Sequence, residues 1–154
     1  MNEVIVILHN IRSTHNVGSI FRTADAAGAT KMYLTGYTPK PVDRFGRPQK
    51  DIAKTALGAH EYVSWETGDI RNVLKNLKKE GFSIISIEQD ERSVALDDFK
   101  TLPKMALILG NEVRGVSKQL RDKSDYIVEI PMHGKKESLN VSVTAGIVLF
   151  SLYK

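Results

Sequence analysis

Two uninterrupted apolar runs, Val4–Leu8 (VIVIL) and Met105–Leu109 (MALIL), constrain the fold more than any other feature of the sequence. A short apolar run without polar alternation predicts a strand that is buried on both faces. Such strands occur mainly in parallel sheets, where helices cover each side. The two runs therefore predict an α/β fold built around a parallel sheet.

Other predicted strands and helices alternate between and beyond these two runs. Asn16 is predicted to cap a helix that ends at Gly28, because glycine favours the left-handed conformation typical of a helix end. Apolar spacing predicts the remaining elements, which are strands at Lys31–Thr35, Glu61–Trp65, Phe82–Ile87 and Tyr126–Ile130 and helices at Asp69–Glu80 and Val116–Lys123. This order predicts a mostly parallel sheet with helices on both faces.

The C-terminal segment Ile130–Lys154 joins a polar loop to the longest apolar stretch of the chain. Alternating β-branched residues such as Val141 and Val143 resemble a strand, whereas the unbroken length and a cap at Ser138 favour a helix. Such a helix is apolar nearly all round, so it must be covered on more than one side. In so small a chain we expect a second copy to provide this cover, which predicts a homodimer.

Composition narrows the class of protein. With 154 residues, 42% hydrophobic and 26% charged, we expect one globular domain over residues 1–154. No uncharged run is long enough for a membrane span and the start lacks the basic residues of a signal peptide, so we expect a cytoplasmic protein without a membrane partner. The absence of cysteine excludes disulfides, and the histidines lack ligand spacing, so no metal is expected. A net charge of +4 favours a polyanionic partner.

The segment Gly36–Lys54 is too long for a tight turn, which is typical of a functional or mobile loop. Its basic residues outnumber Asp43 and Asp51, and they are Lys40, Arg44, Arg47, Lys50 and Lys54. We interpret this segment as a basic loop.

Two polar constellations follow predicted strands. The first, Asn16–Ala24, reads equally well as a capped amphipathic helix with a surface arginine, but Gly18 in its first turn is a poor helix former and indicates a close approach to the backbone. The second, Leu109–Ser117, is a flexible loop at the carboxyl end of a strand, where ligands bind in open α/β sheets. Its glycines do not match a phosphate-binding loop, and a simple capping turn is the alternative.

The third constellation is the polar loop that follows Ile130. His133 is a minor candidate for a base, because a single loop histidine is usually solvated, and Lys135 and Lys136 could contact phosphates.

Taken together and in this order, the three constellations resemble the SpoU/TrmH branch of the SPOUT RNA methyltransferases. The matching residues are Asn16, Gly18 and Arg22–Ala24 in the first motif, Ile108–Glu112 and Gly115 in the second, and Ile130–Met132 and Ser138–Ser142 in the third. The resemblance runs from about Ile5 to Tyr153.

This resemblance implies a C-terminal trefoil knot, S-adenosylmethionine as methyl donor, a homodimer, and methylation of a ribose 2′-hydroxyl in tRNA or rRNA. It implies that the donor is held by Leu109, Gly110, Asn111, Glu112, Ile130, Met132, Leu139 and Asn140. It implies that catalysis or binding of the substrate ribose involves Asn16, Arg22, Glu112, Ser138 and Asn140. The family assigns activation of the hydroxyl to Arg22. Because guanidinium stays protonated, we expect Arg22 to bind a phosphate or the developing alkoxide, with phosphate, water or Glu112 as the proton acceptor.

Larger members of this branch carry extra segments that bind RNA, and we expect no such segment here. RNA would then bind to the domain itself, across both subunits of a dimer. The candidate contacts are Arg12, Lys40, Arg44, Arg47, Lys50, Lys54, Arg114, Lys118, Arg121 and Lys135. Such phosphate contacts position an RNA without selecting its sequence. The alternatives are a catalytically silent RNA-binding protein of the same fold and a Rossmann-type nucleotide-binding domain, which lacks support because no glycine-rich loop follows Val4–Leu8.

Overall fold

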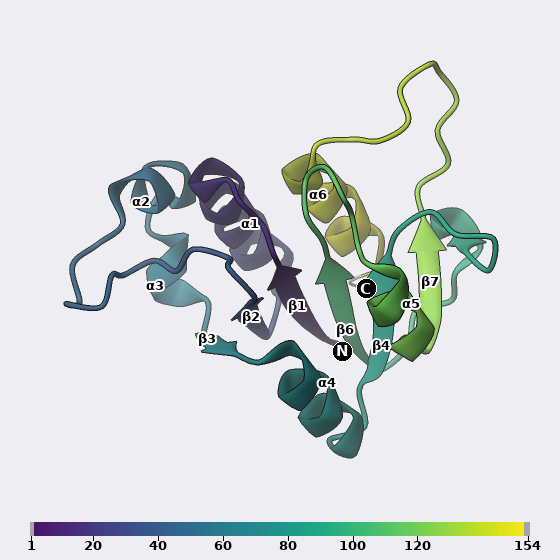
Figure 1. Ribbon diagram of the computed structural model, residues 1–154, viewed down its shortest axis with the longest axis horizontal. Helices are drawn as coiled ribbons and strands as arrows, with labels where there is room; N and C mark the ends of the chain where they lie inside the picture. The colour runs from purple at the N-terminus through teal and green to yellow at the C-terminus, as the bar shows by residue number, and fades with distance from the viewer. Residues whose placement is uncertain (1, 153–154) are drawn as a thin grey trace.

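The computed structural model describes residues 2–152, and its centre is a seven-stranded sheet in the order β3-β2-β1-β6-β4-β7-β5 (Figure 1). Every pair of neighbouring strands runs parallel. The strands are β1 (Glu3–His9), β2 (Lys31–Thr35), β3 (Trp65–Gly68), β4 (Ser83–Ile87), β5 (Val94–Ala95), β6 (Lys104–Leu109) and β7 (Tyr126–Glu129). The two apolar runs that predicted the fold form β1 and β6, which lie side by side at the centre.

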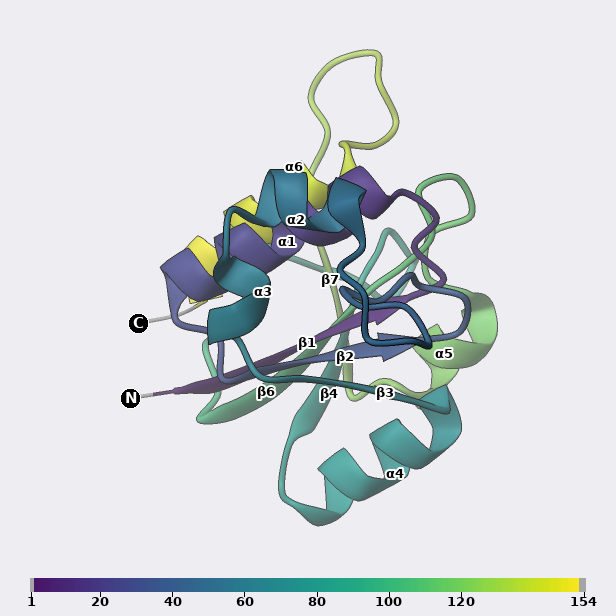
Figure 2. The same cartoon turned by 90° about the vertical axis from the view of Figure 1, so that its left-hand side faces the viewer.

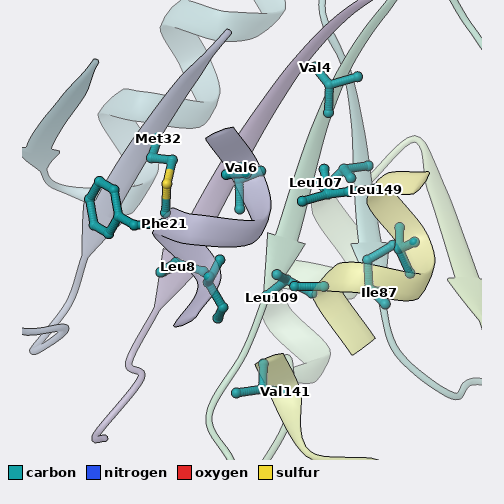
Figure 3. Close-up of a cluster of buried hydrophobic side chains, with 14 of the residues drawn as sticks. Val4, Val6, Leu8, Phe21, Met32, Ile87, Leu107, Leu109, Val141 and Leu149 are labelled. Carbon is teal, nitrogen blue, oxygen red and sulfur yellow. The ribbon is translucent and has the colours of Figure 1, made fainter. Parts of the chain in front are cut away.

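Helices cover both faces of the sheet (Figure 2). They are α1 (Thr14–Ala27), α2 (Lys50–Ala56), α3 (Ala59–Tyr62), α4 (Ile70–Lys79), α5 (Lys118–Lys123) and α6 (Val141–Leu152), with a 3₁₀ turn at Leu96–Asp98. Side chains of a strand alternate between its faces. Val4, Val6 and Leu8 accordingly join the core under α1, α2 and α6 (Figure 3), whereas Ile5 and Ile7 join the core under α4 and α5.

The predicted α/β fold, with a mostly parallel sheet and helices on both faces, is confirmed. The trefoil knot stays a prediction. Among residues 2–152 no helix is both long and apolar enough to cross a membrane. The predicted C-terminal helix is confirmed as α6 up to Leu152, and the last two residues of the prediction, Tyr153 and Lys154, lie outside the described residues.

Two predicted elements are wrong. The strand expected at Glu61–Trp65 begins only at Trp65, because Ala59–Tyr62 forms a helical turn that buries Ala59 and Val63 against the core. The basic loop is also shorter than expected, since its end forms α2 and buries Ile52 and Ala56. In both places burial against α1 overrides the local pattern.

The close approach expected at Gly18 is confirmed, and the neighbour is α2. A Cβ atom at Gly18 would lie 1.9 Å from Thr55 Oγ1 and 2.5 Å from the carbonyl oxygen of Ile52. Only a residue without a side chain lets α1 and α2 pack this closely. The glycine therefore serves helix packing inside the chain.

Candidate active site

A cleft of about 290 Å³ opens at the carboxyl ends of β4, β6 and β7, beside the first turns of α6. We call it the edge cleft. Its walls come from three segments that are far apart in sequence, Ile87–Gln89, Leu109–Gly115 and Glu129–Leu139, together with Arg121 of α5 and Val141 and Thr144 of α6. All the predicted cofactor-binding residues line this cleft except Asn140. Ligands bind at this edge of open parallel sheets, so its position fits a binding site.

The loop after β6 is held by contacts with itself and with Glu88, which follows β4 and accepts a hydrogen bond from the N–H of Val116 at 2.9 Å. Asn111 Oδ1 accepts hydrogen bonds from the backbone N–H groups of Val113 and Arg114, at 2.9 Å each. The N–H of Gly115 donates to the carbonyl of Asn111, and a Cβ atom at Gly110 would lie 2.4 Å from the carbonyl oxygen of Gly115. This loop is therefore a rigid wall of the cleft, rather than the flexible loop expected from its glycines.

Glu112 joins this loop to the start of α1. Its carboxylate accepts hydrogen bonds from the backbone N–H groups of Arg12 and Ser13, at 2.9 Å each, and from Asn16 Nδ2 at 3.1 Å. Burial raises the pKa of Glu112, but the bonds from Arg12, Ser13 and Asn16 outweigh burial, so the pKa lies below its ordinary value of 4.5. Glu112 is thus an ionised link between the first and second motifs.

Asn16 is not the cap of α1. Ser13 caps the helix, with its side chain accepting a hydrogen bond from the N–H of Asn16 at 3.1 Å, and the helix begins at Thr14. Asn16 lies in the first turn, where its amide is free to donate to Glu112. The correction places Asn16 in the same network as Glu112.

We expect Glu112→Gln to lower the free energy of unfolding by about 2 kcal/mol near neutral pH, because a charged acceptor of three hydrogen bonds is lost. The wild-type contribution is complete above the ordinary carboxyl pKa of 4.5 and is lost as the pH falls through the lower pKa of the folded protein. Urea unfolding at about pH 7 and about pH 3 measures this, and the difference between the two proteins should narrow at the lower pH.

Glu91→Gln is the matched control, because Glu91 is exposed and the described residues give it no hydrogen bond. The control variant should match the wild type at both pH values. A constant difference between Glu112→Gln and the wild type across the pH range would contradict an ionic role for Glu112.

Residues of the third motif have two roles: some line the cleft wall, and one caps a helix. Ser138 and Leu139 line the edge cleft, on an exposed loop that projects from the body between β7 and α6 (Figure 1). The prediction that Ser138 caps the last helix is wrong. Asn140 takes that position, since its Oδ1 accepts from the N–H of Ser142 at 2.8 Å and its carbonyl accepts from the N–H of Thr144 at 3.0 Å.

Arg22 does not line the edge cleft. It is exposed on α1, in a hollow of about 520 Å³ that we call the Arg22 hollow. Lys54, Leu57 and Phe150 line the same hollow, so it lies between α1, the end of α2 and the end of α6. Within one chain, the structure therefore places Glu112 and Ser138 on the cleft wall, with Asn16 bonded to Glu112, and leaves Arg22 apart.

The predicted RNA-binding residues are exposed, except Arg121, which is half-buried and lines the edge cleft, and they fall into separate groups. Arg44 and Arg47 flank the exposed ring of Phe45, with guanidinium carbons 4.8 and 4.9 Å from its centroid. Lys54 faces the Arg22 hollow, and Arg12 and Arg114 line a third hollow beside the edge cleft. Three of the candidates are tied to carboxylates. Lys118 pairs with Asp122 and Arg121 with Asp90, at 2.8 Å each, and Arg47 pairs with Asp43 at 2.9 Å. Lys40, Lys50 and Lys135 are exposed as well.

Sequence reasoning missed several lining residues. Glu88 and Gln89 follow β4 and Thr144 lies on α6, and all three line the edge cleft. Tyr37 follows β2 and lines the third hollow. The rule that ligands bind at carboxyl ends of parallel strands could have identified the residues after β2 and β4. No group of three or more potential metal ligands occurs among residues 2–152.

Comparison with known proteins gives consistent matches over nearly the whole chain. A family model described as the SpoU rRNA Methylase family matches residues 3–150. A tRNA (guanosine(18)-2′-O)-methyltransferase of Aquifex aeolicus is 33% identical over 150 residues, covering 96% of this chain and 67% of the relative. A 23S rRNA (guanosine-2′-O-)-methyltransferase of Ralstonia nicotianae is 35% identical over 149 residues, covering 96% of this chain and 57% of the relative.

Among solved structures, an AdoMet-bound rRNA methyltransferase from Sinorhizobium meliloti superposes with a TM-score of 0.88 at 26% identity. The superposition covers 97% of this chain and 55% of that chain. The chain spans 67% of the length of the Aquifex relative and 57% of the length of the Ralstonia relative.

Proposed function

The chain belongs to the SpoU rRNA methylase family, and from that premise we propose that it transfers a methyl group from S-adenosylmethionine to a ribose 2′-hydroxyl of tRNA or rRNA. The observation that carries the proposal is the convergence of the second and third motifs on one cleft at the carboxyl edge of the sheet. The names of the Aquifex and Ralstonia relatives, both 2′-O-methyltransferases, support the same reaction class.

The edge cleft has the composition that the methyl donor needs. Leu109, Ile130 and Met132 offer an apolar wall for an adenine ring, and the loop Gly110–Gly115 exposes backbone beside it. The cleft volume of about 290 Å³ is at the lower end of ordinary ligand sites. When bound there, S-adenosylmethionine would supply an electrophilic methyl group on a sulfonium, and no metal is required.

The residues of the chain would then position the acceptor and manage charge. In the reaction the 2′-oxygen gains the methyl group, the methyl–sulfur bond breaks, and the hydroxyl proton leaves. Arg22 stays protonated, so it would bind a substrate phosphate or the 2′-oxygen as negative charge develops. Glu112 is a poor proton acceptor, because its pKa is lowered and both of its oxygens accept hydrogen bonds. We therefore assign the proton to a phosphate or water, and give Glu112 and Asn16 positioning roles.

A homodimer would complete this site. The outward face of α6 presents Val143, Ile147 and Phe150, which are spaced at helical intervals and exposed, with Phe150 60% accessible. This stripe continues into the Arg22 hollow through Phe150. A second copy seated on the stripe would cover the apolar face and bring its edge cleft towards Arg22 of the first copy.

We expect Phe150→Asp to weaken the dimer by about a hundredfold or more, because a two-fold axis buries two unpaired carboxylates at once. Light scattering across micromolar concentrations measures the change in mass. Phe45→Asp is the matched control, since Phe45 is similarly exposed, 66% accessible, and lies on the loop before α2 and outside the α6 stripe. A wild-type protein that stays monomeric, or a Phe150→Asp variant that stays dimeric, would contradict this interface.

RNA would lie across the basic groups that surround these hollows. Arg44 and Arg47 on the loop, Lys54 near Arg22, and Arg12 and Arg114 near the cleft would contact phosphates. Each such contact should contribute roughly 0.7–0.9 to the slope of log K against log salt concentration. A cytoplasmic location and the absence of a separate RNA-binding segment stay predictions.

The test of the proposed function is incubation with methyl-labelled S-adenosylmethionine and unmodified tRNA and rRNA, followed by nucleoside analysis. A 2′-O-methylated nucleoside is expected, and its identity names the RNA class and base. Calorimetry with the donor alone runs in parallel. Donor binding without any methylated nucleoside would refute the enzyme and support the alternative of a catalytically silent RNA-binding protein.

A further inference from the structure

The third hollow, of about 720 Å³, lies beside the edge cleft and shares a wall with it. We call it the Tyr37 basin. Arg12, Thr14, Tyr37 and Pro39 line it alone, and Asn111, Val113 and Arg114 line both this hollow and the edge cleft. The basin lies at the carboxyl ends of β1, β2 and β6, whose strands point towards one edge of the sheet (Figure 2). A ligand bound in it would therefore be the immediate neighbour of a ligand in the edge cleft.

Tyr37 is anchored at both ends while its ring stays open to solvent. Its hydroxyl oxygen accepts a hydrogen bond from Asn111 Nδ2 at 2.9 Å, and its backbone N–H donates to Asn10 Oδ1 at 3.1 Å. Asn111 is itself buried, 9% exposed, and also donates to the carbonyl of Asn10 at 3.0 Å. The tyrosine nevertheless remains 58% exposed. A ring held in this way can stack on a ligand without a large loss of conformational entropy.

The backbone before Tyr37 is specialised for this placement. Gly36 has a φ of +62°, and a Cβ atom there would lie 1.8 Å from Asn10 Oδ1. Asn10 also takes a positive φ, +56°, which is uncommon for a residue other than glycine. Strained backbone persists only where surrounding contacts hold it and is concentrated at functional sites. The turn that presents the ring is thus built by two residues in conformations that most side chains avoid.

The charge around the ring is positive. Arg12 and Arg114 line the basin and are exposed, and neither side chain has an ion-pair partner among the residues that the structure describes. The nearby carboxylate of Glu112 is engaged with backbone N–H groups and Asn16. An aromatic face between free guanidinium groups matches a nucleotide, whose base stacks on the ring and whose phosphates bind the cations.

We propose that the Tyr37 basin holds an unpaired nucleobase of the RNA, stacked on Tyr37, and thereby positions the neighbouring ribose at the edge cleft. This inference rests on the proposed function, because it takes RNA as the ligand. It makes Tyr37 a positioning residue and Asn111 its anchor. It also names the substrate class as nucleotides in loops or single strands, since a base paired within a duplex cannot present its face to the ring.

The test uses an unstructured oligoribonucleotide of about a dozen nucleotides with one central 2-aminopurine, because base stacking on aromatic residues tolerates any sequence. Stacking on a tyrosine ring quenches 2-aminopurine fluorescence. The wild type should quench saturably, and Tyr37→Leu should abolish the quench and weaken binding roughly ten- to a hundredfold. Tyr37→Phe keeps the ring and should retain the quench. The fully paired duplex should bind more weakly and show no quench.

Two controls separate stacking from damage to the fold. Tyr62→Leu removes another exposed tyrosine, one that lies outside the basin, and should leave the quench unchanged. Affinity for S-adenosylmethionine, measured by calorimetry, should be the same in Tyr37→Leu as in the wild type. A quench that survives in Tyr37→Leu, or one that is equal with the duplex, overturns the inference.

The outcomes also separate this inference from the proposed function. Saturable quenching that depends on Tyr37, without methylation of any RNA, would support the basin and refute the enzyme. Methyl transfer whose kcat/KM for RNA is unchanged in Tyr37→Leu would support the enzyme and overturn the basin. A raised KM for RNA with unchanged donor affinity is the result that supports both.

Discussion

Replacing Arg22 by alanine is expected to lower methyl transfer about a hundred- to a thousandfold while leaving the affinity for S-adenosylmethionine unchanged. The reason for the first effect is the loss of a fixed positive charge where negative charge develops. The reason for the second is that Arg22 lies outside the edge cleft within its own chain. Single-turnover kinetics with the methylated RNA, together with donor calorimetry, measures both effects.

Arg22→Lys distinguishes charge from geometry. Lysine keeps the positive charge but loses the planar fork that binds two oxygens at once, so we expect an activity between those of the wild type and the alanine variant. Full activity in Arg22→Lys would mean that the fork is irrelevant. A large loss of donor affinity in Arg22→Ala would contradict the separation of Arg22 from the cleft.

Mixing two inactive variants tests whether Arg22 acts on the partner's cleft. Leu139→Arg should block the cleft, because it adds bulk and positive charge to an exposed wall residue where a cationic donor must bind. A heterodimer with Arg22→Ala would contain one intact site, formed by the cleft of one subunit and Arg22 of the other. With random reassociation, roughly a quarter of wild-type activity should return. No recovery from stable heterodimers would place Arg22 and its cleft in the same subunit.

Gly110→Ala is expected to destabilise the protein by about 3 kcal/mol and to abolish measurable binding of the donor. A Cβ atom at this position would lie 2.4 Å and 2.5 Å from the carbonyl oxygen and carbon of Gly115, and 2.6 Å from the nitrogen of Val116. These are backbone atoms, so no rotamer change can relieve the overlap. The loop that forms the cleft wall must therefore shift.

Gly134→Ala is the matched control for this substitution. It lies in the projecting loop before α6, and a Cβ atom there would meet nothing within 4 Å. We expect a change in unfolding free energy within about 0.5 kcal/mol and normal donor affinity. Urea unfolding and calorimetry on both variants measure the contrast. Normal donor affinity in Gly110→Ala would show that the packing of this loop does not shape the cleft.

The elements with a strong hydrophobic pattern were predicted from the sequence, and the elements with a weak hydrophobic pattern were not. The runs that became β1 and β6 are apolar over their whole length, so burial on both faces was readable from them alone. The residues from Glu61 to Trp65 carry a mixed pattern, and their helical turn depends on packing against α1. Local propensity is a weak prior where such tertiary contacts decide.

The predicted capping residues of α1 and α6 were wrong for a related reason. Asn16 and Ser138 are good capping residues by type, but Ser13 and Asn140 make the capping hydrogen bonds. Several residues near a helix start can serve as caps, and the choice depends on where the chain leaves the preceding strand. For Asn16 the tertiary structure supplied a competing acceptor in Glu112, which lies 96 residues away in sequence.

By itself the sequence determined that the chain forms a parallel α/β sheet, and its motifs identified the family and part of the lining of the edge cleft. Only the tertiary structure decided that Arg22 lies in a separate hollow, that Glu112 is held by the start of α1, and that Tyr37 stands beside the cleft. The physical reason is the range of the interactions. Burial periodicity is local and can be read along the chain, whereas these placements depend on loops that meet only after the strands are paired.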